Sequence, residues 1–141
     1  MQLAVVLLVI GCTNQAPVMV TKRLPPQPDD IHMLASVSGT LVLEAGCVRL
    51  QGDPLPDGRP ATRSTPVFPG GYLLRGSHVL GLQGQPVAAI DRHFAGGGGH
   101  VSDAALRAMA TVDARLLDAC AGPYALINPT REEMGWPPPP R

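Results

Sequence analysis

The sequence predicts a mainly β fold, a small antiparallel barrel or sandwich with one C-terminal amphipathic helix. Its 141 residues suffice for one domain with a single modest core. Its 16 glycines and 16 prolines, both well above average usage, indicate many turns. From residue 36 onward, short apolar runs alternate with turn residues every few positions, which is typical of an antiparallel meander.

The strands follow from short apolar runs bounded by Gly, Pro, Asp or Ser. Residues 38–50 predict two strands that meet at a turn at Ala45-Gly46, and the second strand alternates between two faces as a half-buried strand does. A loop rich in Pro and Gly follows over residues 53–66. Further strands are predicted at residues 67–68, 72–75, 78–82, 86–90 and, at the end of the domain, 124–127.

One helix is predicted over residues 102–120. Ser102 is a suitable N-cap, Asp103 favours the positive end of the helix, and Gly122 with Pro123 ends it. Apolar residues recur at helical spacing and form one face, at Leu106, Met109, Val112, Leu116 and Cys120. This helix is expected to cap an open end or edge of a β domain that spans residues 36–128. Residues 129–141 are expected to form a Pro-rich tail.

The first twelve residues indicate an export signal. Leu3 to Ile10 are all apolar, and this run is far shorter than the ~20 residues that a membrane-spanning helix needs. It ends in Val9-Ile10-Gly11-Cys12, which resembles the lipobox of bacterial lipoproteins. The resemblance implies a signal peptide over residues 1–11, which is removed, and acyl chains such as palmitate on Cys12. The alternative is a buried first strand that ends at a packed cysteine.

Residues 12–35 are expected to form the lipidated cysteine and a Pro-rich tether. This stretch contains Pro17, Pro25, Pro26 and Pro28 among polar residues. Position 13 is Thr and not Asp, so the inner-membrane retention signal of the lipoprotein family is absent. The resemblance therefore implies a protein of the bacterial cell envelope, lipid-anchored in the outer membrane or in the outer leaflet of the plasma membrane.

Two cysteines are left if Cys12 carries lipid. Cys47 and Cys120 would then form an even pair in an oxidising compartment, and we expect a disulfide between them. Closing a loop of about 70 residues would stabilise the fold by about 4 kcal/mol. Two reduced, buried cysteines are the alternative. A cysteine-based zinc site is disfavoured because no CxxC-type spacing occurs.

Few residues indicate catalysis or a metal. His93 and His100 flank a run of four glycines, with Asp91 nearby, and these three are weak candidates for a metal site. Their spacing matches no helical zinc motif, so solvated loop histidines and a flexible glycine link are the preferred interpretation. Neither GxSxG nor a phosphate-binding motif occurs. We therefore expect no cofactor and no enzyme activity.

The charge balance disfavours a nucleic-acid partner. Eleven basic and eleven acidic residues cancel, and the sequence lacks the basic stripe that phosphate backbones require. The expected partner is instead the membrane, through the lipid anchor, together with an envelope protein or ligand that the sequence does not identify.

The body of the chain also resembles a group of small uncharacterised bacterial exported proteins. The resemblance covers roughly residues 38–127 and rests on GTLVLEAGCVRL, PGGYLL, QPVAAI, the glycine run and CAGPY. It implies a fold and no known activity. The sequence thus predicts a membrane-anchored envelope lipoprotein with a binding or structural role. Two alternatives stay open: a small periplasmic metal-dependent enzyme, and a cytoplasmic β protein without a signal peptide.

Overall fold

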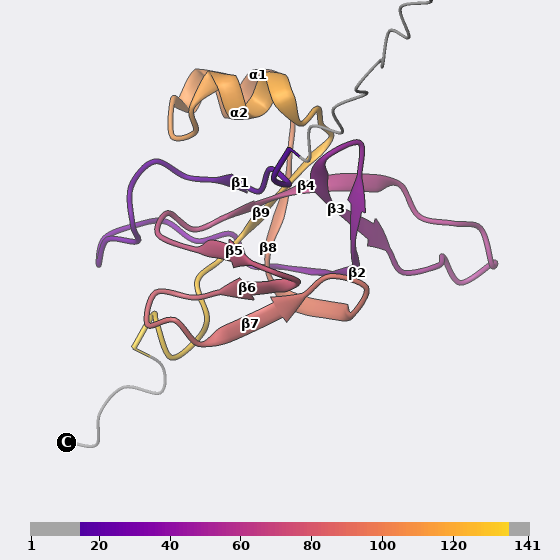
Figure 1. Cartoon of the computed structure of the whole chain (residues 1–141), viewed down its shortest axis with the longest axis horizontal. Helices are drawn as coiled ribbons and strands as arrows, with labels where there is room; N and C mark the ends of the chain where they lie inside the picture. Colours follow the sequence, from indigo (N-terminus) through magenta and orange to yellow (C-terminus); the bar gives the residue numbers. More distant parts are fainter. Residues whose placement is uncertain (1–14, 136–141) are drawn as a thin grey trace, which may run out of the picture.

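The computed structural model describes residues 15–135 and has the mainly β fold that the sequence predicts. A five-stranded barrel lies beside a small antiparallel sheet, with two short helices near the C-terminus (Figure 1). The strands are β1 Val20–Thr21, β2 Ala35–Glu44, β3 Cys47–Gly52, β4 Arg63–Phe68, β5 Leu73–Arg75, β6 His78–Leu80, β7 Pro86–Ala89, β8 His93–Val101 and β9 Tyr124–Ile127. The helices are α1 Asp103–Met109 and α2 Ala114–Ala119. The predicted signal peptide and Cys12 lie outside the described residues.

The barrel closes because β9 pairs with both β8 and β4. The strands follow one another around it in the order β4-β3-β2-β8-β9, and β9 returns to β4. β8 comes back by a long connection to pair with β2, so β8, β2, β3 and β4 form a Greek key. A closed barrel with an odd number of strands cannot alternate direction throughout. The seam between β4 and β9 is accordingly parallel, whereas the other barrel pairs are antiparallel.

Strand β2 is long because it belongs to two sides of the barrel. Its first half pairs with β8 and its second half with β3, and the two pairings overlap at Gly39 and Thr40. A Cβ on Gly39 would lie 2.2 Å from the carbonyl oxygen of Gln51. Glycine is therefore needed where β2 passes from one neighbour to the other.

The small sheet of β5, β6 and β7 is the meander that the turn spacing predicts. It is antiparallel throughout and packs against the barrel, so that the barrel interior and this sheet share one core (Figure 1). The buried members of this first core are Val37, Leu41, Val48, Leu50, Phe68, Tyr72, Val79, Phe94, Ala125 and Ile127.

The single helix predicted over residues 102–120 is wrong, because the chain forms two helices there. Ser102 is the N-cap of α1, as predicted, but α1 ends at Ala110 in the left-handed conformation, with φ of 53°. Asp113 then caps α2. Between them the backbone N–H of Arg23 donates to the carbonyl of Thr111 (2.9 Å), which ties the break to the segment after β1. Among the described residues, no helix is long and apolar enough to cross a membrane.

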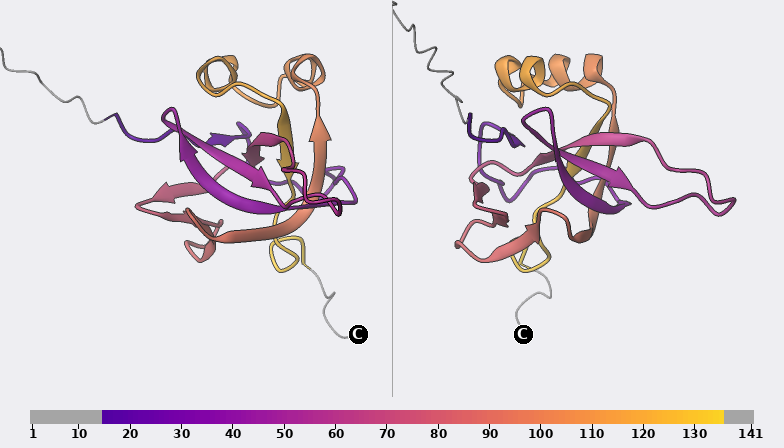
Figure 2. Two further views of the ribbon diagram at one scale, coloured as in Figure 1. Left: turned by 90° about the vertical axis from the view of Figure 1, so that its right-hand side faces the viewer. Right: turned by 45° about the vertical axis from the view of Figure 1, so that its right-hand side comes forward.

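The two helices lie together on one side of the barrel and cover a second core (Figure 2). Arg107 of α1 bridges to Asp118 of α2, with nitrogen and oxygen 2.8 Å apart. Beneath the helices, the outward-facing side chains of β3, β4 and β9 meet apolar residues of α1, α2 and β1. The buried members of this second core are Val20, Cys47, Val67, Leu106, Val112, Leu117, Cys120 and Tyr124.

Part of the predicted tether belongs to the folded domain. The backbone N–H of Val18 donates to the carbonyl of Gly46 (2.7 Å), and the N–H of Val48 donates to the carbonyl of Val18 (2.9 Å). Val20 is buried, and β1 pairs in parallel with β4. The alternating valines of this stretch carry a strand signal that the neighbouring prolines conceal in the sequence. The domain therefore begins well before residue 36.

The glycine run forms part of a strand and is not the flexible link that the sequence predicts. β8 contains all four glycines and pairs with β2 on one side and β9 on the other. A Cβ on Gly98 would lie 1.9 Å from the carbonyl oxygen of Leu126. Only glycine allows β8 and β9 to approach this closely.

Gly98→Ala is therefore expected to lower the free energy of unfolding by about 3 kcal/mol, because backbone atoms must move to admit the methyl group. Gly97→Ala is the matched control. Its Cβ would meet the side chain of Asn128, with the amide nitrogen nearest at 3.0 Å, and the substitution is expected to cost under about 1 kcal/mol. Urea denaturation measures both values. Equal midpoints for the two variants would contradict the close approach at Gly98.

Candidate functional site

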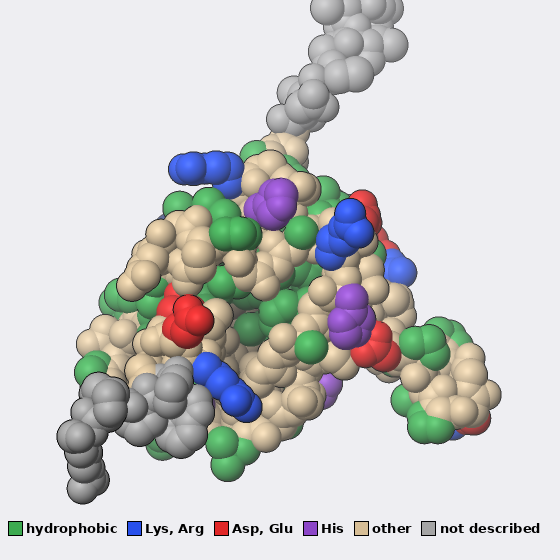
Figure 3. All heavy atoms as spheres, turned by 90° about the horizontal axis from the view of Figure 1, so that it is seen from below, with side chains coloured by type: hydrophobic (Ala, Val, Ile, Leu, Met, Phe, Trp, Pro, Cys, Tyr) green, Lys and Arg blue, Asp and Glu red, His purple; other side chains and the backbone are tan. Residues whose placement is uncertain are grey.

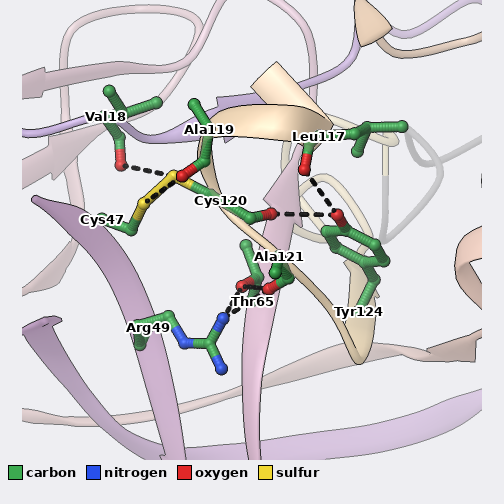
Figure 4. The surroundings of a disulfide bond; sticks show 9 residues. All are labelled: Val18, Cys47, Arg49, Thr65, Leu117, Ala119, Cys120, Ala121 and Tyr124. Atoms are coloured by element: carbon green, nitrogen blue, oxygen red, sulfur yellow. Dashed lines mark hydrogen bonds between the residues drawn. A yellow bond between two sulfur atoms is a disulfide. The ribbon is translucent and has the colours of Figure 1, made fainter. Parts of the chain in front are cut away.

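The predicted disulfide joins β3 to the end of α2. The Sγ atoms of Cys47 and Cys120 are 2.04 Å apart, and both residues are buried. Next to it, the hydroxyl of Tyr124 donates to the carbonyls of Leu117 (3.1 Å) and Cys120 (2.9 Å) (Figure 4). Burial raises the pKa of Tyr124, so its hydroxyl stays protonated and able to donate. The disulfide and the tyrosine together hold α2 against the barrel.

A second group of hydrogen bonds fixes the residue that follows the disulfide. The hydroxyl of Thr65 donates to the carbonyl of Ala121 (2.6 Å), and Nη1 of Arg49 donates to that carbonyl and to Oγ1 of Thr65 (2.5 Å) (Figure 4). The Nε of Arg49 is buried, without a hydrogen-bond partner in the described part of the chain. Arg49 thus crosslinks β3, β4 and the turn before β9 through neutral oxygens.

The three candidate metal ligands do not come together. His93 begins β8, and His100 lies near the other end of the same strand. The Nε2 of His93 lies 3.1 Å from Oδ2 of Asp53, which directly follows β3. Asp91 occupies a tight turn with φ of 63°. Within residues 15–135, no group of three or more His, Cys, Asp or Glu side chains could hold a metal ion.

A groove of about 580 Å³ opens on the side of the barrel away from the helices. Figure 3 shows this side, with apolar atoms gathered in the central hollow. The aromatic rings of Phe68, Tyr72 and Phe94 line the groove, and Arg131 is its one charged lining residue in the described chain. Leu34 stands at its edge with its surface 100% exposed. A groove of this size, with both apolar and polar groups in its lining, suits a small ligand that has an apolar part.

Glu133 fixes one wall of this groove. Its carboxylate accepts hydrogen bonds from the hydroxyl of Tyr72, from the backbone N–H of Leu82 (2.8 Å) and from the backbone N–H of Thr130 (3.0 Å). Burial raises the pKa of Glu133, but these hydrogen bonds outweigh it and hold the pKa below the ordinary value of 4.5. Residues 129–135 therefore pack on the domain, although the sequence predicts a tail there.

Glu133→Gln is expected to lower the free energy of unfolding at neutral pH by about 1 kcal/mol, after allowance for solvent screening of a half-exposed group. Because the folded-state pKa is depressed, this stabilisation is fully present above pH 4.5 and is lost as the pH falls through the folded pKa. Urea denaturation at neutral and acid pH measures it. Glu132→Gln, at the exposed neighbour, is the control and should leave stability unchanged. If the wild type remained more stable than Glu133→Gln at acid pH, the stabilising role of the ionised Glu133 carboxylate would be contradicted.

Sequence patterns did not reveal the groove, because its lining comes from five strands, β2, β4, β7, β8 and β9, and from the segments after β4 and β9. The one sequence feature that could have indicated the groove is its aromatic content, because Phe68, Tyr72 and Phe94 are three of the four Phe and Tyr residues in the chain. Searches of protein-family models, curated proteins and solved structures find no match to this chain. Of the features described above, the disulfide and the groove are the ones that can carry a function.

Proposed function

We propose that the protein is a lipoprotein of the bacterial cell envelope, anchored through lipid on Cys12, whose barrel binds a ligand outside the cytoplasm. The disulfide between Cys47 and Cys120 supports this most strongly. Such bonds form and persist in oxidising compartments and are rare in the cytosol. The chain has three cysteines, so the disulfide leaves Cys12 alone for lipid attachment, at the end of the lipobox-like sequence.

The spacer between Cys12 and the domain limits how far the barrel can lie from the membrane anchor. Five residues separate Cys12 from Val18. The backbone of Val18 is hydrogen-bonded to Val48 in β3 and to Gly46 in the turn before β3. At about 3.5 Å per residue, this spacer holds the domain within about 20 Å of Cys12. The described chain begins on the side that carries the helices, and the groove opens on the other side (Figures 1 and 3). If the helix side faces the anchoring membrane, the groove opens toward the aqueous side and takes its ligand from there.

The groove determines the class of ligand. Its aromatic floor favours an apolar body, and Arg131 at its rim favours an acidic group on that body. Asn128 and Thr130 add polar contacts along the lining. The proposed ligand is accordingly an apolar molecule that carries one anionic group.

The anchor is tested by fractionation of a bacterium that expresses the protein. We expect the protein in the membrane pellet after a high-salt wash, because acyl chains hold it by hydrophobic burial and not by charge. Detergent should release it. Recovery in the soluble fraction with an unprocessed N-terminus would contradict the proposal.

The groove is tested with the fluorescent probe anilinonaphthalene sulfonate, which is apolar and anionic. The purified protein should bind it at one site, and Ala95→Trp, which fills the groove, should abolish binding. Arg131→Ala should weaken it about tenfold. Ala104→Trp on the exposed face of α1 is the control and should bind as the wild type does. Equal binding by both tryptophan variants would contradict the groove as the site.

A further inference from the structure

A second, polar pocket of about 340 Å³ lies toward the start of β4, whereas Phe68 at the end of β4 lines the groove, and Ser36 borders both. It is lined by the first residues of β2 and β4, by the end of β3, by the loop between β3 and β4, and by the end of β8. Its lining residues are Ser36, Val37, Ser38, Leu50, Gly52, Asp53, Ala61, Thr62, Ser64 and His100. Two hydrophobic residues of the first core, Val37 and Leu50, form its apolar part.

The hydroxyl of Ser64 is the feature that points to a ligand. Ser64 is only 3% exposed, yet its side chain makes no hydrogen bond to any described residue, and it lines the pocket. It lies opposite Leu50 in the pairing of β3 with β4, so both side chains face the same side. The side chain of the neighbouring Thr65 faces the other way, and its hydroxyl donates a hydrogen bond to the carbonyl of Ala121. Because Ser64 lines the pocket, its hydroxyl is open to hydrogen bonds with a molecule bound there.

The other polar groups of the pocket define what such a molecule is. Asp53 accepts hydrogen bonds from the hydroxyl of Ser38 (2.8 Å) and from His93 (3.1 Å), and these bonds lower the pKa of Asp53, that from His93 first. The carboxylate therefore stays ionised and repels an anion. Ser36, Thr62 and His100 make no side-chain hydrogen bond within the described chain and are available to a ligand.

We propose that this pocket binds a neutral, hydroxyl-rich small molecule such as a single sugar unit. Ser64, Ser36 and Thr62 can each donate and accept a hydrogen bond, as sugar hydroxyls do. Val37 and Leu50 offer an apolar floor for the carbon–hydrogen face of a sugar ring. Asp53 disfavours phosphate or sulfate, and the described residues offer no three-ligand metal site. The volume is at the small end of the range for ligand pockets.

Glucose, N-acetylglucosamine and inositol are suitable probes, added one at a time to the purified ¹⁵N-labelled protein. We expect at least one of them to shift the amide signals of Ser64 and His100 in a saturable way while the signals of Tyr72 and Arg131 in the groove stay unchanged. Ser64→Ala should weaken that binding about tenfold, which corresponds to one lost hydrogen bond, without lowering the urea midpoint.

Ser77→Ala is the matched control, because Ser77 is exposed in the turn between β5 and β6. It should bind the probe as the wild type does. The proposal is overturned if none of the three probes shifts these signals, or if Ser64→Ala leaves the affinity unchanged. It is also overturned if Ser64→Ala lowers the urea midpoint, since the hydroxyl would then have a partner within the fold. None of these outcomes depends on lipid at Cys12.

Discussion

Replacing both Cys47 and Cys120 with serine is expected to lower the free energy of unfolding by about 4 kcal/mol. The disulfide links residues 73 positions apart, and without it the unfolded chain regains the conformational entropy of a loop of that length. A domain of this size is stable by only about 5–15 kcal/mol in total. The loss should appear as a large fall in the urea midpoint, followed by circular dichroism.

The reducing agent dithiothreitol supplies the internal control for this variant. Under reduction, the wild type should fall to the stability of the double serine variant, whereas the double variant itself should not change. The same midpoint for oxidised and reduced wild type would contradict a structural disulfide. Thr40→Ser is a matched conservative variant, because it lies on β2 outside both buried cores, and it should change stability by less than about 0.5 kcal/mol.

Cys12→Ser is expected to move the protein from the membrane pellet to the soluble fraction. Serine lacks the thiol that accepts the diacylglycerol, and two or three acyl chains are what make attachment stable. Quantitative immunoblotting of salt-washed membranes measures the change. The double variant Cys47→Ser and Cys120→Ser is the control, since it keeps the anchor and should stay in the pellet. A Cys12→Ser protein that still sediments with membranes would contradict lipid anchoring through this residue.

The fold class could be predicted because its signals are local. Turn residues between short apolar runs indicate the hairpin of β2 and β3, the β5 to β7 meander and the last strand, and all of these form. The parallel seam between β4 and β9 could not be predicted, because pairing between distant strands leaves no trace in local periodicity. The break between α1 and α2 was equally hidden, since Val112 continues the helical spacing while Lys22 pairs with it across the break.

Two errors came from assigning flexibility by composition. The proline-rich start hides Val18 and Val20, which pack against the barrel, and the glycine run reflects crowding at Gly98 instead of freedom. Glycine and proline occur at close backbone contacts as well as in loops, and the sequence alone does not distinguish the two cases.

The candidate sites also differ in whether local sequence signals reveal them. The disulfide could be predicted by counting cysteines, because only two are left after Cys12. The grouping of His93 with His100 and Asp91 rested on nearness in sequence. An extended strand separates the two histidines, and Asp53 contacts His93 from the loop after β3. The groove and the Ser64 pocket depend on which strands meet, which only the folded chain shows.

The intact mass of the protein extracted from membranes of a bacterial host tests the central proposal most directly. A chain that starts at Cys12, heavier by its acyl groups and lighter by the two hydrogens of one disulfide, is the predicted result. A full-length, unmodified chain with three free thiols would contradict both the anchor and the exported disulfide-bonded domain.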